Sequence, residues 1–111
     1  MDIVTYALCK KLASQNVAQK EELVTTPVIG SVLTLTTDKY QLTTMKDNLT
    51  IELPTVNGFT EIHLFFKTTS ELTLMLPNIK WSNLPTLEAN KTFEFKFIYT
   101  TEWLGDCVVY S

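Results

Sequence analysis

One segment near the carboxyl end, residues 91–100, limits what this chain can fold into more than any other feature. Every second side chain in it is aromatic, while polar residues occupy most of the positions between: the rings belong to Phe93, Phe95, Phe97 and Tyr99. Because side chains alternate between the two faces of a strand, the pattern predicts a β-strand with these rings on one face. Burying each ring contributes roughly 2–3 kcal/mol, so this face is expected to be the core.

The remainder of the chain after residue 22 is rich in threonine and β-branched residues, which favour strands. Turn-forming residues divide it into short segments of alternating hydrophobicity. Strands are predicted at 31–37, 40–45, 48–53, 60–67, 71–76, 91–100 and 106–110, with a shorter piece at 79–81. The turn formed by Lys46, Asp47 and Asn48 predicts a hairpin between 40–45 and 48–53. Trp103, Gly105 and Asp106 are assigned to the last turn.

About eight short strands without a second helix predict a mainly β fold, in which an N-terminal α-helix precedes an antiparallel, jelly-roll-like β-sandwich. The helix is expected over residues 2–20, because apolar residues recur there at three- and four-residue spacing. We divide the chain into residues 1–22, a helical anchor or oligomerisation element, and residues 23–111, the β-sandwich domain.

A helix of this length is marginal alone in water, so it needs a surface to pack on. That surface is either its own β-domain or the same helix of another copy. We favour the second, because the stripe is compact and is flanked by Lys10 and Lys11. The predicted oligomer interface is formed by Val4, Leu8 and Leu12.

Composition excludes several partners. The formal net charge is −3, and all nine basic residues are lysines scattered along the chain. Proteins that bind phosphate backbones concentrate basic residues on one face and favour arginine, so no nucleic acid partner is expected. No apolar run approaches the roughly 18 residues of a membrane span, and no membrane insertion is expected. The N-terminus lacks the basic cluster and long apolar run of a signal peptide, which predicts synthesis in a cytoplasm.

Residues that carry chemistry are few. His63 lies in the middle of a predicted strand. A catalytic triad with a serine and Asp106 is one interpretation, but no nucleophile-elbow sequence supports it. We expect instead a histidine on a polar face or at an interface. One histidine and two distant cysteines, Cys9 and Cys107, do not supply a zinc set, and both thiols are expected to be reduced and buried. We therefore predict no enzyme, no catalytic or metal-binding residues and no cofactor.

Two tryptophans, Trp81 and Trp103, fall in predicted turns, where an indole can stack on a sugar ring. They are the candidate glycan contacts of a carbohydrate-binding module. The other interpretation is that both rings close the ends of the sandwich core, since large aromatic side chains are mostly buried.

The carboxy-terminal half has a recognisable order of short motifs. These are Thr60-Glu-Ile-His-Leu, Leu72-Thr-Leu-Met-Leu-Pro77, Ile79-Lys-Trp81, Pro85-Thr-Leu87, Lys91-Thr-Phe-Glu-Phe-Lys-Phe97 and Thr101-Glu-Trp-Leu-Gly105. The order resembles the small β-domain of tailed-bacteriophage fibre, baseplate and appendage proteins. The opening Met1-Asp-Ile-Val-Thr-Tyr-Ala-Leu-Cys-Lys-Lys11 resembles the short helix that begins many phage and prophage structural proteins.

The resemblance implies a virion structural protein: a head fibre, tail appendage or capsid decoration. Such proteins are commonly homotrimers whose N-terminal helix attaches them to the particle, and some help in host attachment. The implied partners are other copies of the chain, other virion proteins and a bacterial surface glycan. The implied location is the virion, after synthesis in the host bacterial cytoplasm.

Overall fold

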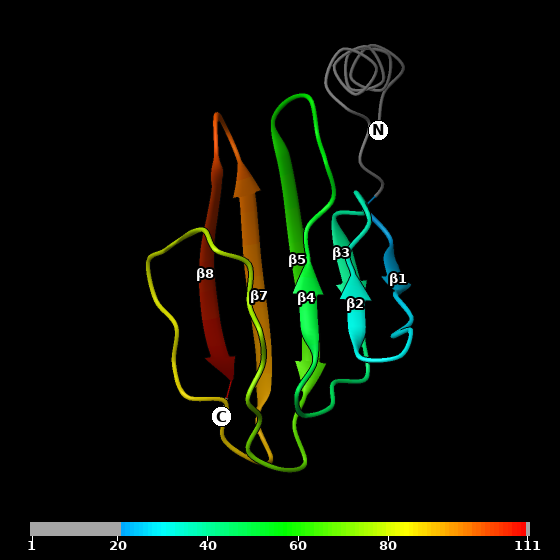
Figure 1. Ribbon diagram of the computed structural model, residues 1–111, viewed down its shortest axis with the longest axis vertical. Helices are drawn as coiled ribbons and strands as arrows, with labels where there is room; N and C mark the ends of the chain where they lie inside the picture. The colour runs from blue at the N-terminus through cyan, green and yellow to red at the C-terminus, as the bar shows by residue number, and fades with distance from the viewer. Residues whose placement is uncertain (1–20, 111) are drawn as a thin grey trace, which may run out of the picture.

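The computed structural model describes residues 21–110, which form eight β-strands and no helix (Figure 1). The predicted helix over residues 2–20 lies outside the described residues, and so do its stripe of Val4, Leu8 and Leu12 and the thiol of Cys9. For the part of the chain that the structure describes, the mainly β fold class is confirmed.

The larger sheet, sheet A, has six strands in the order β1-β3-β5-β7-β8-β6. Its strands are, in chain order, β1 (Leu23–Thr25), β3 (Tyr40–Leu42), β5 (Thr60–Lys67), β6 (Lys80–Trp81), β7 (Thr92–Tyr99) and β8 (Trp103–Tyr110). The centre is antiparallel: β5, β7 and β8, each eight residues long, pair along their whole length. At the rims, β1 runs parallel to β3, β3 parallel to β5, and β6 parallel to β8.

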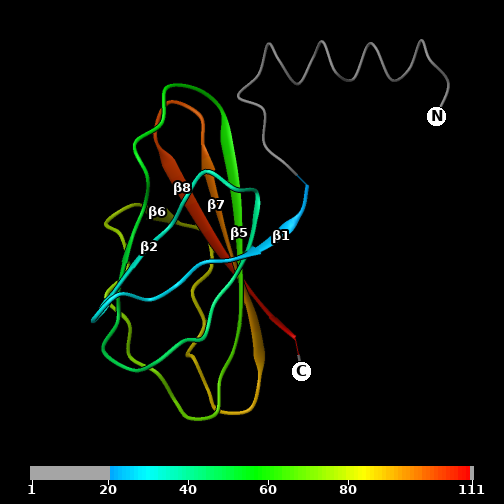
Figure 2. The ribbon, with the colours of Figure 1, turned by 90° about the vertical axis from the view of Figure 1, so that its right-hand side faces the viewer.

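A second layer covers one face of sheet A. It contains β2 (Val32–Thr34) and β4 (Thr50–Glu52), which pair in parallel, and the backbone of Met75 extends it beyond β4. In Figure 1 these strands lie in front of β3 and β5, while the long connection between β5 and β7 passes in front of β7 and β8. The edge-on view in Figure 2 shows both on the same side of sheet A.

The prediction of an antiparallel sandwich is wrong in its pairing. From β1 to β5 the chain alternates between the two layers, so each strand of sheet A is followed by a strand of the second layer that runs back. The next strand of sheet A therefore has the same direction as the previous one, and its partner is parallel. The predicted hairpin of 40–45 with 48–53 fails for this reason. The turn at Asp47 and Asn48 exists, with φ of 60° at Asn48, but it carries the chain from one layer to the other.

Strand boundaries also differ from the prediction: β1 was not predicted, and β2, β3 and β4 are shorter than 31–37, 40–45 and 48–53. The segment 71–76 is not a continuous strand; it contributes single bridges at Leu72 and Met75, because its backbone bonds to two different partners in turn. Trp103 and Gly105 do not form a turn, since β8 already begins at Trp103 and pairs with β7 from there. The tight connection is 100–102, where Thr100 N–H donates to the carbonyl of Glu102 over 3.1 Å.

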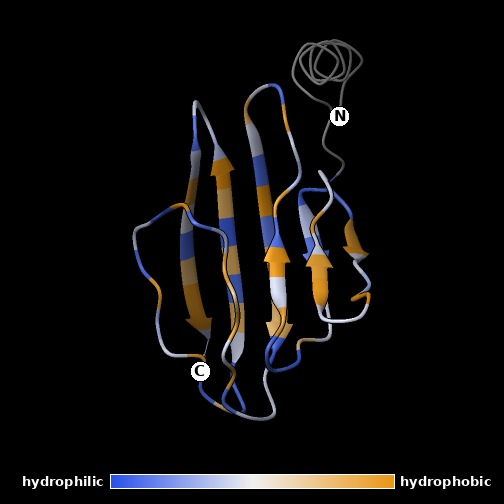
Figure 3. Ribbon diagram, viewed as in Figure 1, coloured by the Kyte–Doolittle hydropathy of each residue, from blue (hydrophilic) through white to orange (hydrophobic). Residues whose placement is uncertain are grey.

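The core lies between the layers, as the aromatic alternation predicts. Phe93, Phe95 and Phe97 are fully buried, and Tyr99 at the end of the strand is half-buried. They pack with the inward side chains of β5 and of the second layer, notably Ile62, Leu64, Phe66, Leu33, Leu35, Leu49 and Ile51. Figure 3 shows the resulting alternation of hydrophobic and hydrophilic residues along β5, β7 and β8.

One buried polar side chain connects the rim to this core. Gln41 of β3 is fully buried and points inward. Its amide donates to the carbonyls of Thr36 and Asp38, each at 2.8 Å, and its oxygen accepts from the hydroxyl of Thr26 at 2.6 Å. Every polar atom of Gln41 therefore has a partner, which offsets the cost of burying it.

Candidate functional site

The second face of sheet A has no described segment over it, and we call it the open face (Figure 2). Strand alternation and register place on it the side chains that point away from the core. From β1 to β8 these are Leu23, Thr25, Tyr40, Leu42, Glu61, His63, Phe65, Lys67, Thr92, Glu94, Lys96, Ile98, Leu104, Asp106, Val108 and Tyr110. Lys80 of β6 shares this face through its register with Leu104, so the described residues present one broad face made of side chains from six strands.

Large apolar side chains are exposed on the open face. Leu23 is 58% exposed, Leu42 41% and Leu104 37%, and Phe65 and Ile98 are half-buried beside them. Single exposed apolar residues are ordinary on a protein surface, whereas a contiguous apolar patch is typical of an interaction surface. Here Leu42 lies opposite Phe65 near one edge, and Leu104 lies opposite Ile98 near the other, so the face has two apolar areas.

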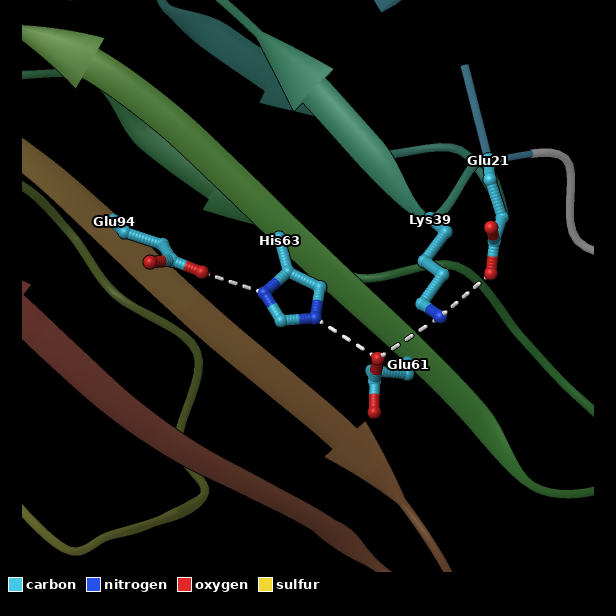
Figure 4. Close-up of polar contacts among 5 residues, drawn as sticks. All are labelled: Glu21, Lys39, Glu61, His63 and Glu94. Atoms are coloured by element: carbon cyan, nitrogen blue, oxygen red, sulfur yellow. Dashed lines mark hydrogen bonds and ion pairs between the residues drawn. The ribbon is translucent and has the colours of Figure 1, made fainter. Parts of the chain in front are cut away.

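At the centre of the open face, His63 bridges two carboxylates (Figure 4). Its Nδ1 lies 2.6 Å from Oε2 of Glu94 on β7, and its Nε2 lies 2.9 Å from Oε2 of Glu61 on its own strand. Glu94 also accepts a hydrogen bond of 2.6 Å from the hydroxyl of Tyr110 on β8. The network continues to the rim, where Lys39 lies 3.5 Å from Glu61 and 3.4 Å from Glu21.

These contacts shift the ionisation of the carboxyl groups. The hydrogen bond from His63 lowers the pKa of Glu61. Burial alone would raise the pKa of Glu94, but the hydrogen bonds from Tyr110 and His63 outweigh it and the pKa is lowered. The bond to Glu94 in turn raises the pKa of Tyr110. Both glutamates are therefore held as carboxylates, the form that accepts these bonds.

A shallow groove of about 430 Å³ lies where β7, β8 and β6 meet. Ile98 and Leu104 form its apolar part, and Lys80, Lys96 and Asp106 contribute charges. Lys96 and Asp106 are direct cross-strand neighbours. Trp81, Ser82 and Gly105 complete its lining, so the groove includes the indole ring of a candidate glycan contact. It can receive an apolar group with polar or charged substituents.

The two tryptophans pack against the core side of sheet A. The ring of Trp81 meets Phe95 and Phe97 edge-on at 5.8 and 5.6 Å, and a Cβ added at Gly105 would lie 2.8 Å from it. Trp103 packs against Tyr99 at 5.4 Å. This geometry agrees with the interpretation that both rings close the core, while glycan contact by Trp81 and Trp103 stays a prediction.

The remaining sequence candidates divide as follows. His63 does lie on the polar face of its strand, and its ring nitrogens contact Glu61 and Glu94 rather than Asp106. Cys107 is buried and reduced, and burial raises the pKa of its thiol to about 12. Among residues 21–110, no three histidine, cysteine or acidic side chains are grouped to hold a metal ion. The described residues also include no helix of the length and hydrophobicity that a bilayer requires.

Comparison with known proteins adds no assignment: no protein-family model matches the chain, and neither does any curated protein or solved structure.

Sequence reasoning missed the cluster around His63. Glu94 is 31 residues from His63 in the sequence, and only the register of β5 against β7 brings it to the histidine ring. A partial signal was present, because Glu61 and His63 occupy alternate positions on the polar side of one strand.

Proposed function

We propose that the protein is a structural, non-catalytic component of a tailed-phage or prophage particle: a head fibre, tail appendage or capsid decoration. In this proposal it assembles as a homo-oligomer, most simply a homotrimer, and takes part in host attachment. The observation that carries the proposal is the open face, which presents exposed Leu23, Leu42 and Leu104 on a six-stranded sheet. The motif order of the carboxy-terminal half supports the particle assignment.

The chemistry of the face supports an assembly role better than a catalytic one. Both nitrogens of the His63 ring contact carboxylates, so neither is left to take a proton from a nucleophile. The charged groups of the cluster are satisfied by one another, and the apolar groups around them are not covered by described residues.

The test of assembly is the mass of the full chain by light scattering coupled to size-exclusion chromatography. One copy has a mass of 12.6 kDa, so a trimer has three times 12.6, about 38 kDa. Leu8→Glu in the predicted stripe should shift the mass toward the monomer, whereas Thr101→Glu in the exposed turn before β8 should not. A wild-type monomer at micromolar concentration would contradict the proposal.

The test of location is mass spectrometry of purified particles from the phage or induced prophage that encodes the chain. The protein should copurify with capsid or tail components at a fixed ratio to them. Its loss from particles after density-gradient purification would contradict the assignment.

The alternative function is carbohydrate binding through Trp81 and Trp103. It has less support, because both rings pack on the core side. Of the two, Trp81 also lines the groove beside β6. Titration with bacterial surface glycans distinguishes the two functions: quenching of tryptophan fluorescence that is lost in Trp103→Phe would favour the alternative.

A further inference from the structure

The loop between β4 and β5, residues 53–59, contains the one asparagine–glycine pair of the sequence, Asn57-Gly58. The loop lies at the end of the molecule where β5 begins, beside the connection 100–102, because Thr60 and Tyr99 are cross-strand neighbours (Figure 1). The side chain of Asn57 is exposed there. Water therefore reaches the pair directly.

The two groups of this pair that can react with each other are unrestrained. Within residues 21–110, neither the side-chain amide of Asn57 nor the backbone N–H of Gly58 has a hydrogen-bond partner. A Cβ added at Gly58 would meet no atom within 4 Å, so the peptide unit between the two residues has room to turn. The nitrogen of Gly58 is therefore free to approach the Asn57 side chain.

Two other exposed asparagines, Asn78 and Asn90, are followed by a backbone N–H that is already a donor. The N–H of Ile79 donates over 3.0 Å to the carbonyl two residues before it. The N–H of Lys91 donates over 3.2 Å to the hydroxyl of Thr68. Both nitrogens are therefore held away from the preceding side chain.

The remaining described asparagines are restrained in other ways. The side-chain amide of Asn83 donates to the carbonyl of Cys107 at 2.8 Å. Asn48 precedes Leu49, whose fully buried side chain fixes the backbone at that point. Among the described residues, Asn57 thus combines exposure, a free side chain and a free following nitrogen.

We propose that Asn57 converts spontaneously to aspartate and isoaspartate in the folded protein. The nitrogen of Gly58 attacks Cγ of Asn57, and the new C–N bond closes a succinimide ring. The side-chain nitrogen leaves as ammonia, together with the proton of the Gly58 N–H. Water then opens the ring: attack at Cγ gives aspartate on the original backbone, and attack at the main-chain carbonyl carbon gives isoaspartate.

The conversion changes the charge and the path of the chain at this end of the molecule. Either product adds a carboxylate to a chain whose formal net charge is −3, and isoaspartate lengthens the backbone before β5 by one methylene. Residues 53–59 belong to no described strand, so both products fit without breaking sheet A. The surface beside Phe59, which is 61% exposed, therefore changes with the age of the protein, whatever the protein assembles with.

The test is peptide mass mapping of the full-length protein after incubation in a mildly alkaline buffer made with heavy-oxygen water. Ring opening places one labelled oxygen in the product, and digestion in ordinary water leaves any conversion during handling unlabelled. We expect label in the peptide that contains Asn57 and none at the other described asparagines. In urea the rate at Asn90 should rise, because the bond from Lys91 to Thr68 is lost, while the rate at Asn57 should stay the same.

Gly58→Ala should slow the conversion about tenfold, because a Cβ hinders the attacking nitrogen and each factor of ten corresponds to about 1.4 kcal/mol in the barrier. Thr55→Ala is the matched control in the same loop and should leave the rate unchanged.

Three results would overturn the proposal. The first is a folded protein without label at Asn57 under conditions that label the chain there in urea. The second is conversion at Asn78 or Asn90 of the folded protein as fast as at Asn57. The third is a Gly58→Ala variant that reacts at the rate of the wild type.

Discussion

The two faces of sheet A use the same strands but are stabilised in different ways. On β7, Phe93, Phe95 and Phe97 point inward and are removed from water completely. Glu94, which follows Phe93 on β7, points outward, and its carboxylate accepts hydrogen bonds from His63 on β5 and Tyr110 on β8. The inward face is stabilised by burial of apolar area, which depends on shape, whereas the outward face depends on charge and therefore on pH.

The largest effect expected from this comparison is in the core. Phe95→Ala removes a ring that contacts Phe66, Phe97 and Trp81, and should lower the free energy of unfolding by about 3–5 kcal/mol. Urea denaturation measures the loss. Phe65→Ala, on the open face of the adjacent strand, is the matched control and should cost clearly less; equal losses would contradict the difference between the faces.

The second largest effect on the free energy of unfolding is electrostatic, and it depends on pH in the acidic range. Glu61 and Glu94 have lowered pKa values in the folded chain, so their stabilisation is complete above the unfolded value of about 4.3. This stabilisation is lost as the pH falls through the pKa values that the two carboxyl groups have in the folded chain. Glu94→Ala should cost about 1.5–3 kcal/mol at neutral pH, because charged hydrogen bonds are lost, and the cost should shrink below about pH 4. Unfolding measured at several pH values checks this, and a cost independent of pH would contradict it.

A third, smaller effect concerns the contact between β6 and β8. At Gly105 a Cβ would lie 2.8 Å from the Trp81 ring and 2.9 Å from Ile79. Gly105→Ala should therefore cost about 1–3 kcal/mol through overpacking and shift tryptophan fluorescence. Gly58→Ala serves as the control, because no atom lies within 4 Å of the added Cβ. Thermal unfolding of both variants measures the difference.

The smallest effect tests whether the open face is covered in an assembly. Leu104→Ser should lower the stability of a single copy by about 1 kcal/mol, because the side chain is 37% exposed and only part of its apolar area is lost from the fold. If copies bury this face, the cost should rise with protein concentration, since association stabilises the folded state. Unfolding measured over a hundredfold range of concentration distinguishes the two cases.

The sequence predicted two of the three long central strands well, whereas the first half of β8, Trp103–Tyr110, was assigned to a turn. Residues 60–67 match β5 in full, and 91–100 contains β7, because eight alternating residues leave no other periodicity. It did not predict the parallel pairs. A turn at Asp47 and Asn48 indicates where the chain reverses, but not whether the returning strand joins the same sheet or the opposite layer.

The candidate site was predictable only in part. The polar position of His63 follows from alternation on β5. Its contact with Glu94 depends on the register of β5 against β7, which lie far apart in the sequence, and Tyr110 joins through the β7–β8 hairpin. Local patterns do not specify register across such separations, so the cluster required the structure.

The alternation of the first strands between two layers has a consequence for folding kinetics. The β7–β8 hairpin closes through residues 100–102 alone, so it can form early. The pairs β1–β3, β2–β4 and β3–β5 each require the chain to cross to the other layer and return before a single rung forms. These non-local pairs have the larger loop-closure entropy, and the half of the molecule that enters the sheet first in sequence should be the last to complete it.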